Sequence, residues 1–462
     1  MATQFRKDQR ESFKDGILEF IKRVDKCAPI GTIKGSNKST LPPLFEPALS
    51  KIGYEVNAEF GTGNLKSDDC GLGFARKDIL RDDCVNGKDF THKKGYYIYF
   101  GYKYNEPKEY YLTIGGILNK PDCRAREIIE KINKSWHYKE LDLEKITDDF
   151  LEMVDYFNEF KIIDFMMKGA RMKAKIKKLL ESNKNVILTG APGTGKTHLA
   201  KEVAKEFVGD SIDSSDRIKL TQFHPSYDYT DFVEGLRPIQ KSSGDSIGFE
   251  RNDGVFKAFC KEALKNLNEK FVFIIDEINR GELSKIFGEL FFAIDPGYRG
   301  EKGRVDTQYQ NLIADNDDFA DGFFVPENVY IIGTMNDIDK SVESMDFAVR
   351  RRFAWVEVKA SDTQDAILSA LDENLKNEAI ARMNRLNDTI ESQDGLSKEY
   401  HIGAAYFLKL RNYDGDFEKL WENHLRGLLF EYTRGFPNQN EIMEKFKNAY
   451  NGTQSNDNSN GQ

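Results

Sequence analysis

The sequence lacks long apolar runs and a regular arrangement of cysteines. No segment approaches the ~20 consecutive apolar residues of a membrane-spanning helix. Residues 1–15 are charged throughout and contain no apolar core of a secretory signal. The five cysteines are odd in number and form no C-x-x-C pair, which argues against a disulfide framework and against a zinc site. We therefore expect a soluble, cytoplasmic protein with reduced thiols and no membrane association.

A strong positive charge is also missing. The chain carries 67 Lys and Arg side chains against 76 Asp and Glu side chains, a net charge of −9. Residues 1–120 are the exception, because 20 basic side chains there outnumber 16 acidic ones, which leaves −13 for the remainder. This N-terminal part is the candidate surface for nucleic acid. An ordinary solvated surface explains an excess of +4 about equally well.

The length of 462 residues exceeds what one hydrophobic core usually serves, so we expect two or three domains. Apolar residues at helical spacing predict an amphipathic helix over 1–25, and two tyrosine-rich runs at 96–102 and 109–114 predict a β-hairpin. The patterns together predict a smaller α+β N-terminal domain (1–120), a helical linker (121–165), an α/β core (166–360), a helical lid (361–450) and a disordered tail (451–462).

The most informative motif is the octapeptide GAPGTGKT at 190–197. It follows the apolar run 186–188 and precedes the helical pattern of 198–204, which is the strand-loop-helix setting of a P-loop. Its glycines let several backbone N–H groups point at one phosphate, Lys196 reaches the β- and γ-phosphate oxygens, and Thr197 offers a hydroxyl to Mg²⁺. The predicted nucleotide-binding residues are Gly190, Pro192, Gly193, Thr194, Gly195, Lys196, Thr197 and His198.

Two further apolar runs end in polar side chains. The run 271–275 is followed by Asp276 and Glu277, where Asp276 holds the Mg²⁺ shell through water and Glu277 polarises the attacking water as general base. The run 329–333 leads to Asn336, whose amide can orient that water beside the γ-phosphate. These carboxyl ends of strands are where open α/β sheets bind ligands.

Three consecutive arginines, at 350–352, follow the third run. An arginine at this place in AAA+ proteins reaches the nucleotide of a neighbouring subunit and neutralises charge in the transition state. We expect Arg351 to be this finger, although Arg350 and Arg352 stay open as alternatives. A basic helix end is the simpler explanation for any one of them.

The segments around these motifs resemble the McrB family, the GTP-hydrolysing subunits of modification-dependent restriction systems. The resemblance is carried by residues 222–229, 231–238, 276–280, 283–289 and 325–330. It implies an AAA+ P-loop core with a helical lid, preceded by a DNA-binding domain. It also implies GTP and Mg²⁺ as cofactors.

The chain departs from the family pattern at two places. The family signature Met-Asn-Thr-Ala-Asp reads Met-Asn-Asp-Ile-Asp at 335–339, so the resemblance gives Asn336 and Asp339 joint action on the lytic water while Thr and Ala are replaced. In the lid, the family's Ile-Gly-His-Ser-Tyr-Phe reads Ile-Gly-Ala-Ala-Tyr-Phe at 402–407, so the histidine is absent.

The N-terminal segment 60–64 and the tyrosine-rich hairpin resemble McrB-like domains that flip a modified cytosine into an aromatic pocket. The Pro-Trp pair typical of the family is missing, and the first tryptophan is Trp136. Aromatic residues that alternate along a strand are more often core than pocket, about two to one. The candidates for stacking are Tyr96, Tyr97, Tyr99, Phe100, Tyr102 and Tyr104.

The sequence as a whole predicts a GTPase that forms a ring, with a hexamer implied by the resemblance, and binds modified double-stranded DNA through residues 1–120. No nuclease motif is evident, so an McrC-like partner subunit is expected to cut the DNA. No Asn-Lys-x-Asp motif is present, so GTP over ATP follows from the resemblance alone. The alternatives are a MoxR-like AAA+ ATPase that remodels proteins, and a non-catalytic nucleotide switch or DNA-binding module, which would need none of Glu277, Asn336 and Arg351.

Overall fold

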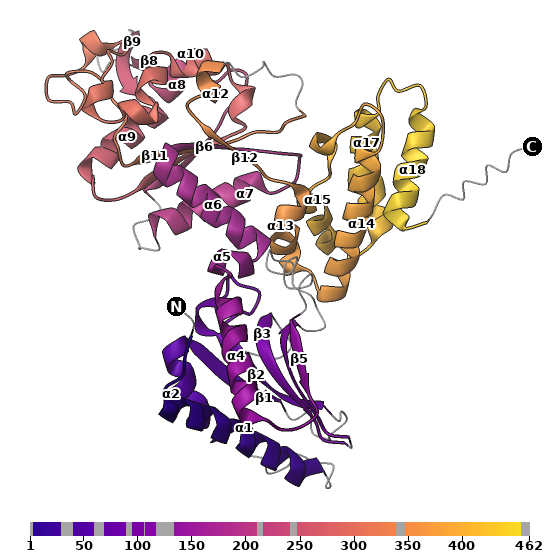
Figure 1. Ribbon diagram of the computed structural model, residues 1–462. Helices are drawn as coiled ribbons and strands as arrows, with labels where there is room; N and C mark the ends of the chain where they lie inside the picture. The colour runs from indigo at the N-terminus through magenta and orange to yellow at the C-terminus, as the bar shows by residue number, and fades with distance from the viewer. Residues whose placement is uncertain are drawn as a thin grey trace, which may run out of the picture. The chain divides into compact units, whose positions relative to one another are not determined.

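The chain folds into two units, Met1–Arg171 and Met172–Gln462. The computed structural model in Figure 1 describes nine stretches: residues 3–28, 40–59, 69–88, 95–105, 107–116, 134–209, 216–240, 247–338 and 347–453. These stretches do not include Asp339, the segment 60–64 or most of the expected disordered tail. Every helix in the described stretches is too short or too polar to cross a membrane.

The N-terminal unit is built on an antiparallel five-stranded sheet in which sequential strands are neighbours. The strand order is β1-β2-β3-β4-β5, with β1 (Tyr54–Glu59), β2 (Asp69–Arg76), β3 (Tyr96–Lys103), β4 (Glu109–Gly116) and β5 (Ser135–Tyr138). Three helices pack on one face through a shared apolar core, namely α1 (Lys7–Cys27), α2 (Pro42–Ile52) and α4 (Leu143–Asn158). This arrangement confirms the α+β class, the first helix and the tyrosine-rich hairpin of β3 and β4.

The side-chain pattern explains why one face of this sheet is covered. In α1, Phe13, Ile17 and Phe20 recur at helical spacing and are fully buried. In β3, Ile98 and Phe100 alternate with residues of the other face and are equally buried. The helices and the sheet therefore share one apolar layer.

The predicted helical linker over 121–165 is wrong for its described part. β5 pairs with β4, with Trp136 opposite Leu112, and α4 places Phe150 against Phe13 with ring centroids 4.5 Å apart. The charged residues of α4 form one side of an amphipathic helix, and its apolar residues form the other side, which packs in the core of the unit. The unit continues through α5 (Ile162–Phe165), so its boundary falls near residue 171 and not near 120.

The second unit contains a parallel five-stranded sheet, as expected of a P-loop core. Its order is β12-β6-β11-β10-β7, with β6 (Asn185–Thr189), β7 (Ile218–Gln222), β10 (Phe271–Asp276), β11 (Val329–Thr334) and β12 (Ala354–Glu357). The central strands are almost entirely apolar, because helices cover both faces. One face packs on α6 (Lys168–Asn183) and α7 (Lys196–Val208), and the other packs on α8 (Tyr229–Phe232), α9 (Val255–Lys265), α10 (Leu283–Phe287) and α11 (Leu290–Ala293).

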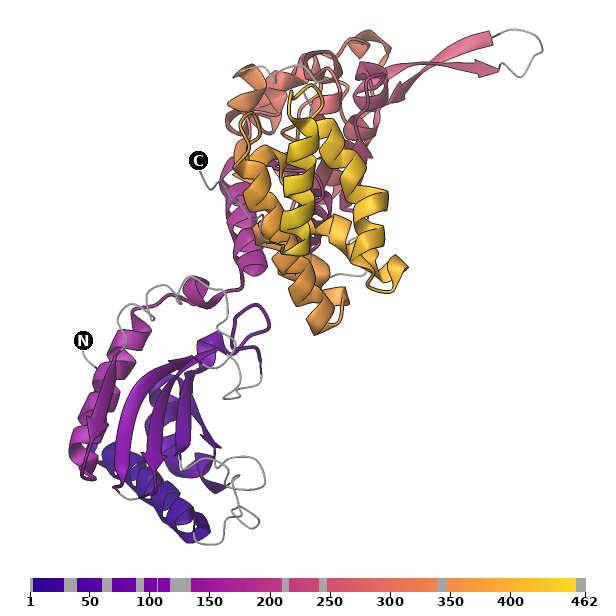
Figure 2. The same ribbon diagram turned by 90° about the vertical axis from the view of Figure 1, so that its right-hand side faces the viewer.

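A two-stranded hairpin was not expected from the sequence. β8 (Glu234–Gln240) and β9 (Ile247–Asp253) pair in antiparallel register and project from the core in Figure 2. Pro238 and several charged residues interrupt the alternation that signals a strand. The hairpin is anchored instead at its base, where Glu234 accepts hydrogen bonds from Lys257 and Arg251.

The C-terminal residues form the predicted helical lid around an apolar core of their own. Figure 1 shows these helices as the orange to yellow bundle. The principal helices are α13 (Ala360–Ile367), α14 (Glu373–Glu391), α15 (Ala404–Phe407), α16 (Phe417–Leu420), α17 (Arg426–Tyr432) and α18 (Gln439–Asn451). The described cysteines, which are Cys27, Cys70, Cys84 and Cys260, are all free thiols.

Candidate nucleotide site

The P-loop lies between the end of β6 and the start of α7, at the point where the strand order reverses. Gly190, Gly193 and Gly195 all have positive φ, at 141°, 76° and 81°. A Cβ on Gly190 would lie 2.3 Å from the carbonyl oxygen of Val358. The loop therefore requires glycine for both its conformation and its packing.

Lys196 is folded back into this loop. Its Nζ donates to the carbonyl oxygens of Gly190 and Ala191, each at 2.9 Å, and to Asn336 Oδ1 at 2.8 Å. Burial lowers the pKa of Lys196 to about 8, and the nearby carboxylates only partly oppose this effect. A buried ammonium hydrogen-bonded to neutral oxygens is a donor set that fits phosphate.

The residues predicted for Mg²⁺ come together at the carboxyl end of β10. Thr197 Oγ1 donates to Asp276 Oδ1 at 2.6 Å. Thr334, the last residue of β11, donates to the same oxygen at 2.6 Å and accepts a bond from the N–H of Glu277. A hydroxyl beside a carboxylate fits the oxygen ligands that Mg²⁺ takes in nucleotide sites. Thr334 was missed by the sequence reasoning, although it ends the strand next to Asp276.

The predicted base and its partner also meet. Asn336 Nδ2 donates to Glu277 Oε1 at 2.9 Å. Glu277 has a left-handed backbone, with φ 52° and ψ 47°, which costs a residue other than glycine about 1–3 kcal/mol. Such strain persists only where the surrounding structure holds the residue in place. Glu277 is held in this conformation directly after Asp276, the last residue of β10.

The three arginines have different environments. Arg350 stacks its guanidinium on Trp355, 5.0 Å from the ring centroid. Arg352 is 8% exposed and donates to the carbonyl oxygen of Ala348. Arg351 is exposed and, within the described residues, its guanidinium makes no interaction. Arg350 and Arg351 are therefore exposed and Arg352 is buried, and the choice of Arg351 as the finger stays a prediction.

The lid contacts the P-loop directly, which the sequence did not reveal. The N–H groups of Gly403 and Ala405 donate to the carbonyl oxygens of Pro192 and Gly193, each at 3.0 Å. A Cβ on Gly403 would lie 2.0 Å from the carbonyl carbon of Gly193. In the segment 402–407 the family histidine is absent, and Gly403 was the signal that the sequence offered for this contact. His198, by contrast, is exposed on the first turn of α7.

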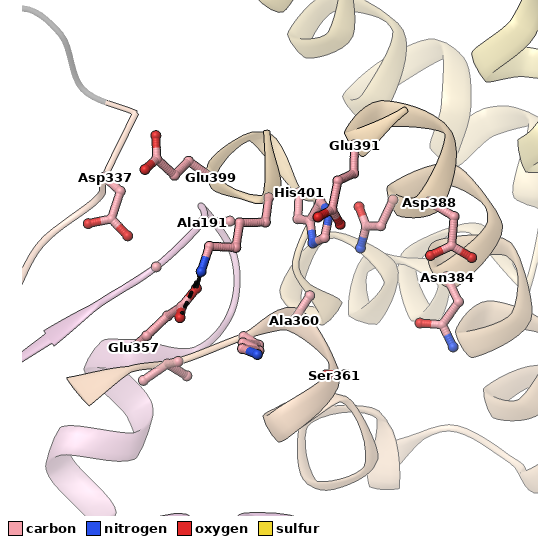
Figure 3. Close-up of a pocket in the computed structure, with 15 residues that line it drawn as sticks. Ala191, Asp337, Glu357, Ala360, Ser361, Asn384, Asp388, Glu391, Glu399 and His401 are labelled. Atoms are coloured by element: carbon pink, nitrogen blue, oxygen red, sulfur yellow. Dashed lines mark hydrogen bonds and ion pairs between the residues drawn. The ribbon is translucent and has the colours of Figure 1, made fainter. Parts of the chain in front are cut away.

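An acidic cavity of about 230 Å³ lies beside the start of the P-loop, between core and lid residues. Figure 3 shows Asp337 and Glu399 near Ala191. Lys398 pairs with Glu357 at 2.9 Å, and burial raises the pKa of Asp337. The carboxylates that line the cavity are Asp337, Glu357, Asp388, Glu391 and Glu399. Their excess negative charge disfavours phosphate in this cavity.

Most of the N-terminal aromatic candidates are core. Tyr96, Phe100 and Tyr102 are buried under the helices, and Tyr104 packs against the same core. The other face of β3 carries Tyr97, which is 1% exposed, and Tyr99, which is half-buried. The simpler explanation is therefore correct for most of these side chains.

A row of rings nevertheless crosses that other face. Tyr99 lies 5.9 Å from Tyr111, and Tyr111 lies 5.6 Å from His137 between ring centroids. Glycines oppose the tyrosines on neighbouring strands, and a Cβ on Gly101 would lie 2.1 Å from the Tyr111 ring. We call Tyr99, Tyr111 and His137 the outer-face rings.

Two family models match parts of the second unit. The AAA domain of the dynein-related subfamily matches residues 185–353, and the α-helical lid domain of McrB matches residues 378–441. Over 238 residues the chain is 40% identical to the EcoKMcrB subunit of a type IV methyl-directed restriction enzyme of Escherichia coli K12. The second unit is thus similar to the AAA core and the lid of McrB. That alignment covers 50% of this chain and 49% of its relative.

A second relative of the chain is the YdiS component of the type II restriction enzyme BsuMI of Bacillus subtilis 168. It is 31% identical over 212 residues, which cover 41% of this chain and 60% of that protein. The chain thus spans about half to three fifths of the length of these two curated relatives. The structure of C. elegans PCH-2 is 15% identical with a TM-score of 0.23, over 62% of this chain and 68% of that one.

Proposed function

We propose that this chain is the GTP-hydrolysing and DNA-recognising subunit of a methyl-directed restriction system. The single observation that carries the proposal is the hydrogen-bonded path from Lys196 through Asn336 to Glu277, set beneath an McrB-type lid. A protein that only binds nucleotide has no need of a base held in this way.

Each residue then has a defined task. When bound, GTP supplies the reacting phosphoryl group and Mg²⁺ supplies a cation that neutralises its charge. The P-loop amides and Lys196 hold the phosphates, while Thr197 and Asp276 hold the cation shell. Asn336 orients Glu277, and Glu277 accepts the proton of the attacking water. Asp339 assists at the water, by resemblance to the family signature.

The exposed Arg351 supports action on a second molecule. A finger donated to the neighbouring nucleotide makes a head-to-tail contact, which closes into a ring when the rotation allows. We propose a hexamer, as implied by the family. Fingers are worth ~10³–10⁵ in rate where they have been measured in other NTPases.

The DNA-reading part of the proposal belongs to the N-terminal unit. The outer-face rings offer stacking surface, and the partly exposed Tyr111 lies beside the exposed His137. Glu109 pairs with both Lys103 and His137 on the same face and supplies polar groups next to the rings. We propose that this face accepts an unstacked, modified cytosine from duplex DNA. An McrC-like partner then supplies the nuclease.

The alternative is a MoxR-like ATPase that remodels proteins. It would use the same phosphate-binding residues, but it gives no reason for an McrB-type lid. It is therefore the less supported of the two.

The test is steady-state hydrolysis of GTP and ATP by the full chain. We expect faster turnover with GTP, and we expect the Glu277→Gln variant to bind GTP without turning it over. Glu262→Gln is the matched control, because Glu262 is an exposed carboxylate that pairs with Lys265 on the surface of α9. Equal or faster ATP turnover would favour the MoxR-like function, and full activity of Glu277→Gln would remove it as the base.

A further inference from the structure

A buried polar cluster lies beneath the arginine segment, apart from the residues that face the nucleotide. Asn185, the first residue of β6, is fully buried. Its Nδ2 donates to the carbonyl oxygens of Arg352, at 2.9 Å, and Ile294, at 2.7 Å. The strand that leads into the P-loop therefore also holds the backbone directly after Arg351.

Arg299 fixes the orientation of the Asn185 amide. Its guanidinium is 1% exposed and donates to Asn185 Oδ1, to the carbonyl oxygen of Ile294 and to that of Val329. Because Oδ1 faces the charged donor, the Nδ2 group must face the carbonyls. Hydrogen bonds from an ionised donor are about twice as strong as neutral ones, so this orientation is well defined.

The segment around Arg351 is anchored on both sides. Val349 and Phe353 are buried in the core, and the Arg352 side chain turns back to the carbonyl oxygen of Ala348. Between these anchors Arg351 is exposed. The hydrogen bond from Asn185 holds the Arg352 carbonyl, directly after Arg351, against the start of β6.

We propose that Asn185 is a positioning residue for the arginine finger, acting through the Arg352 backbone so that Arg351 is presented to the neighbouring subunit. This inference rests on the proposed function, since it assumes that Arg351 acts in trans. Misplacing a reacting group by about 1 Å costs up to ~10²-fold in rate. Loss of Asn185 should therefore reduce turnover and leave nucleotide affinity intact.

The variant Asn185→Asp tests the donor group of the amide, Nδ2, separately from its acceptor, Oδ1. It is isosteric and keeps an acceptor for Arg299, but it removes both donors to the carbonyls. Asn328→Asp is the matched control. Asn328 is also buried, and its Nδ2 donates to three backbone carbonyls in the last turn of α9 and the turn after it, those of Ala263, Asn266 and Glu269.

Mixing variants distinguishes a subunit that gives a finger from one that receives it. Asn185→Asp alone should hydrolyse nucleotide on the order of 10- to 100-fold more slowly. Mixed with Lys196→Ala, it should recover activity, because its intact sites receive fingers from the Lys196→Ala subunits. Mixed with Arg351→Ala, it should not recover, because neither subunit then offers a well-placed finger. Asn328→Asp should support hydrolysis in both mixtures.

The reverse pattern, with recovery only in the Arg351→Ala mixture, would place the defect in the P-loop strand and overturn the inference. Normal turnover of Asn185→Asp, or an equal loss in Asn328→Asp, would overturn it as well. A mixture of Arg351→Ala with Lys196→Ala tests the proposed finger separately, because its failure to recover would refute action in trans itself. If circular dichroism shows that Asn185→Asp does not fold, Asn185→Ser, with one small donor, enters the same mixtures.

Discussion

Asn336 holds Glu277 by a hydrogen bond of 2.9 Å from Nδ2 to Oε1. The two residues follow neighbouring parallel strands, β11 and β10, whose carboxyl ends meet at one edge of the sheet. The oxygen of the same amide, Asn336 Oδ1, accepts a hydrogen bond from Lys196 Nζ. One side chain thus sets the position of both the proposed base and the P-loop lysine.

Asn336→Ala should lose turnover while keeping nucleotide binding. Without the amide, Glu277 is no longer held toward the water, and a general base contributes ~10²–10⁴-fold to rate. Hydrolysis rates and calorimetric binding measure the two effects. Asn311→Ala is the control, because Asn311 is exposed on the surface of the α/β part of the second unit. A variant that loses binding and turnover together would show that Asn336 acts mainly through Lys196.

Asp276→Asn should raise the Mg²⁺ concentration needed for half-maximal turnover. Its Oδ1 accepts hydrogen bonds from Thr197 and Thr334. Residues that orient a metal's ligands typically affect affinity by 10–100-fold, so we expect Thr334→Val to shift the Mg²⁺ requirement by about tenfold or more. Thr389→Val, in lid helix α14, should leave the requirement unchanged. An unshifted titration for Thr334→Val would limit that residue to a structural role.

Gly403→Ala should weaken nucleotide binding by separating the lid from the P-loop. The new Cβ would lie 2.0 Å from the carbonyl carbon of Gly193, so either the loop or the lid must move. Gly427→Ala is the matched control, because a Cβ there meets nothing within 4 Å. Equilibrium binding of a fluorescent nucleotide measures the effect. Equal affinity of the two variants would contradict a role for the lid contact.

Tyr111→Ala should weaken DNA binding by the full chain, and Tyr111→Phe should keep most of it. Stacking of a base on an aromatic ring is worth ~1–3 kcal/mol, or about 5- to 100-fold in affinity. Titrations with methylated, hydroxymethylated and unmodified duplexes at two salt concentrations test this expectation. The small charge of residues 1–120 predicts a shallow salt dependence. No binding to any duplex would refute the proposed DNA-reading role.

Asp317→Asn should destabilise the core in a pH-dependent way. Burial raises the pKa of Asp317, but hydrogen bonds from Lys261 and from the N–H of Phe319 outweigh it and hold the pKa below its usual value. The folded pKa is then below the unfolded one, so the stabilisation is present above about pH 4 and is lost as pH falls through the folded pKa. We expect the variant's lower melting midpoint at pH 7 to approach that of the wild type in acid. Asp321→Asn, at a side chain 92% exposed, should change little at either pH.

The sequence by itself determined the elements whose signals are local. The glycine-rich loop, the apolar strand before it and the helix after it lie within 186–204, and the structure has all three. β10 and β11 were predicted because parallel strands covered on both faces are continuous apolar runs, each ending in the polar side chains of the site. Whether those side chains act as proposed remains a prediction.

The tertiary structure alone decided which distant residues meet. β5 and α4 join the first unit instead of forming a linker, because their apolar sides complete its core. Gly403 contacts the P-loop from the lid, and Asn185 reaches the carbonyl of Arg352, 167 residues along the chain. Local periodicity shows which side of an element is apolar but not what that side packs against. Such partners are fixed only when the whole chain closes around its cores.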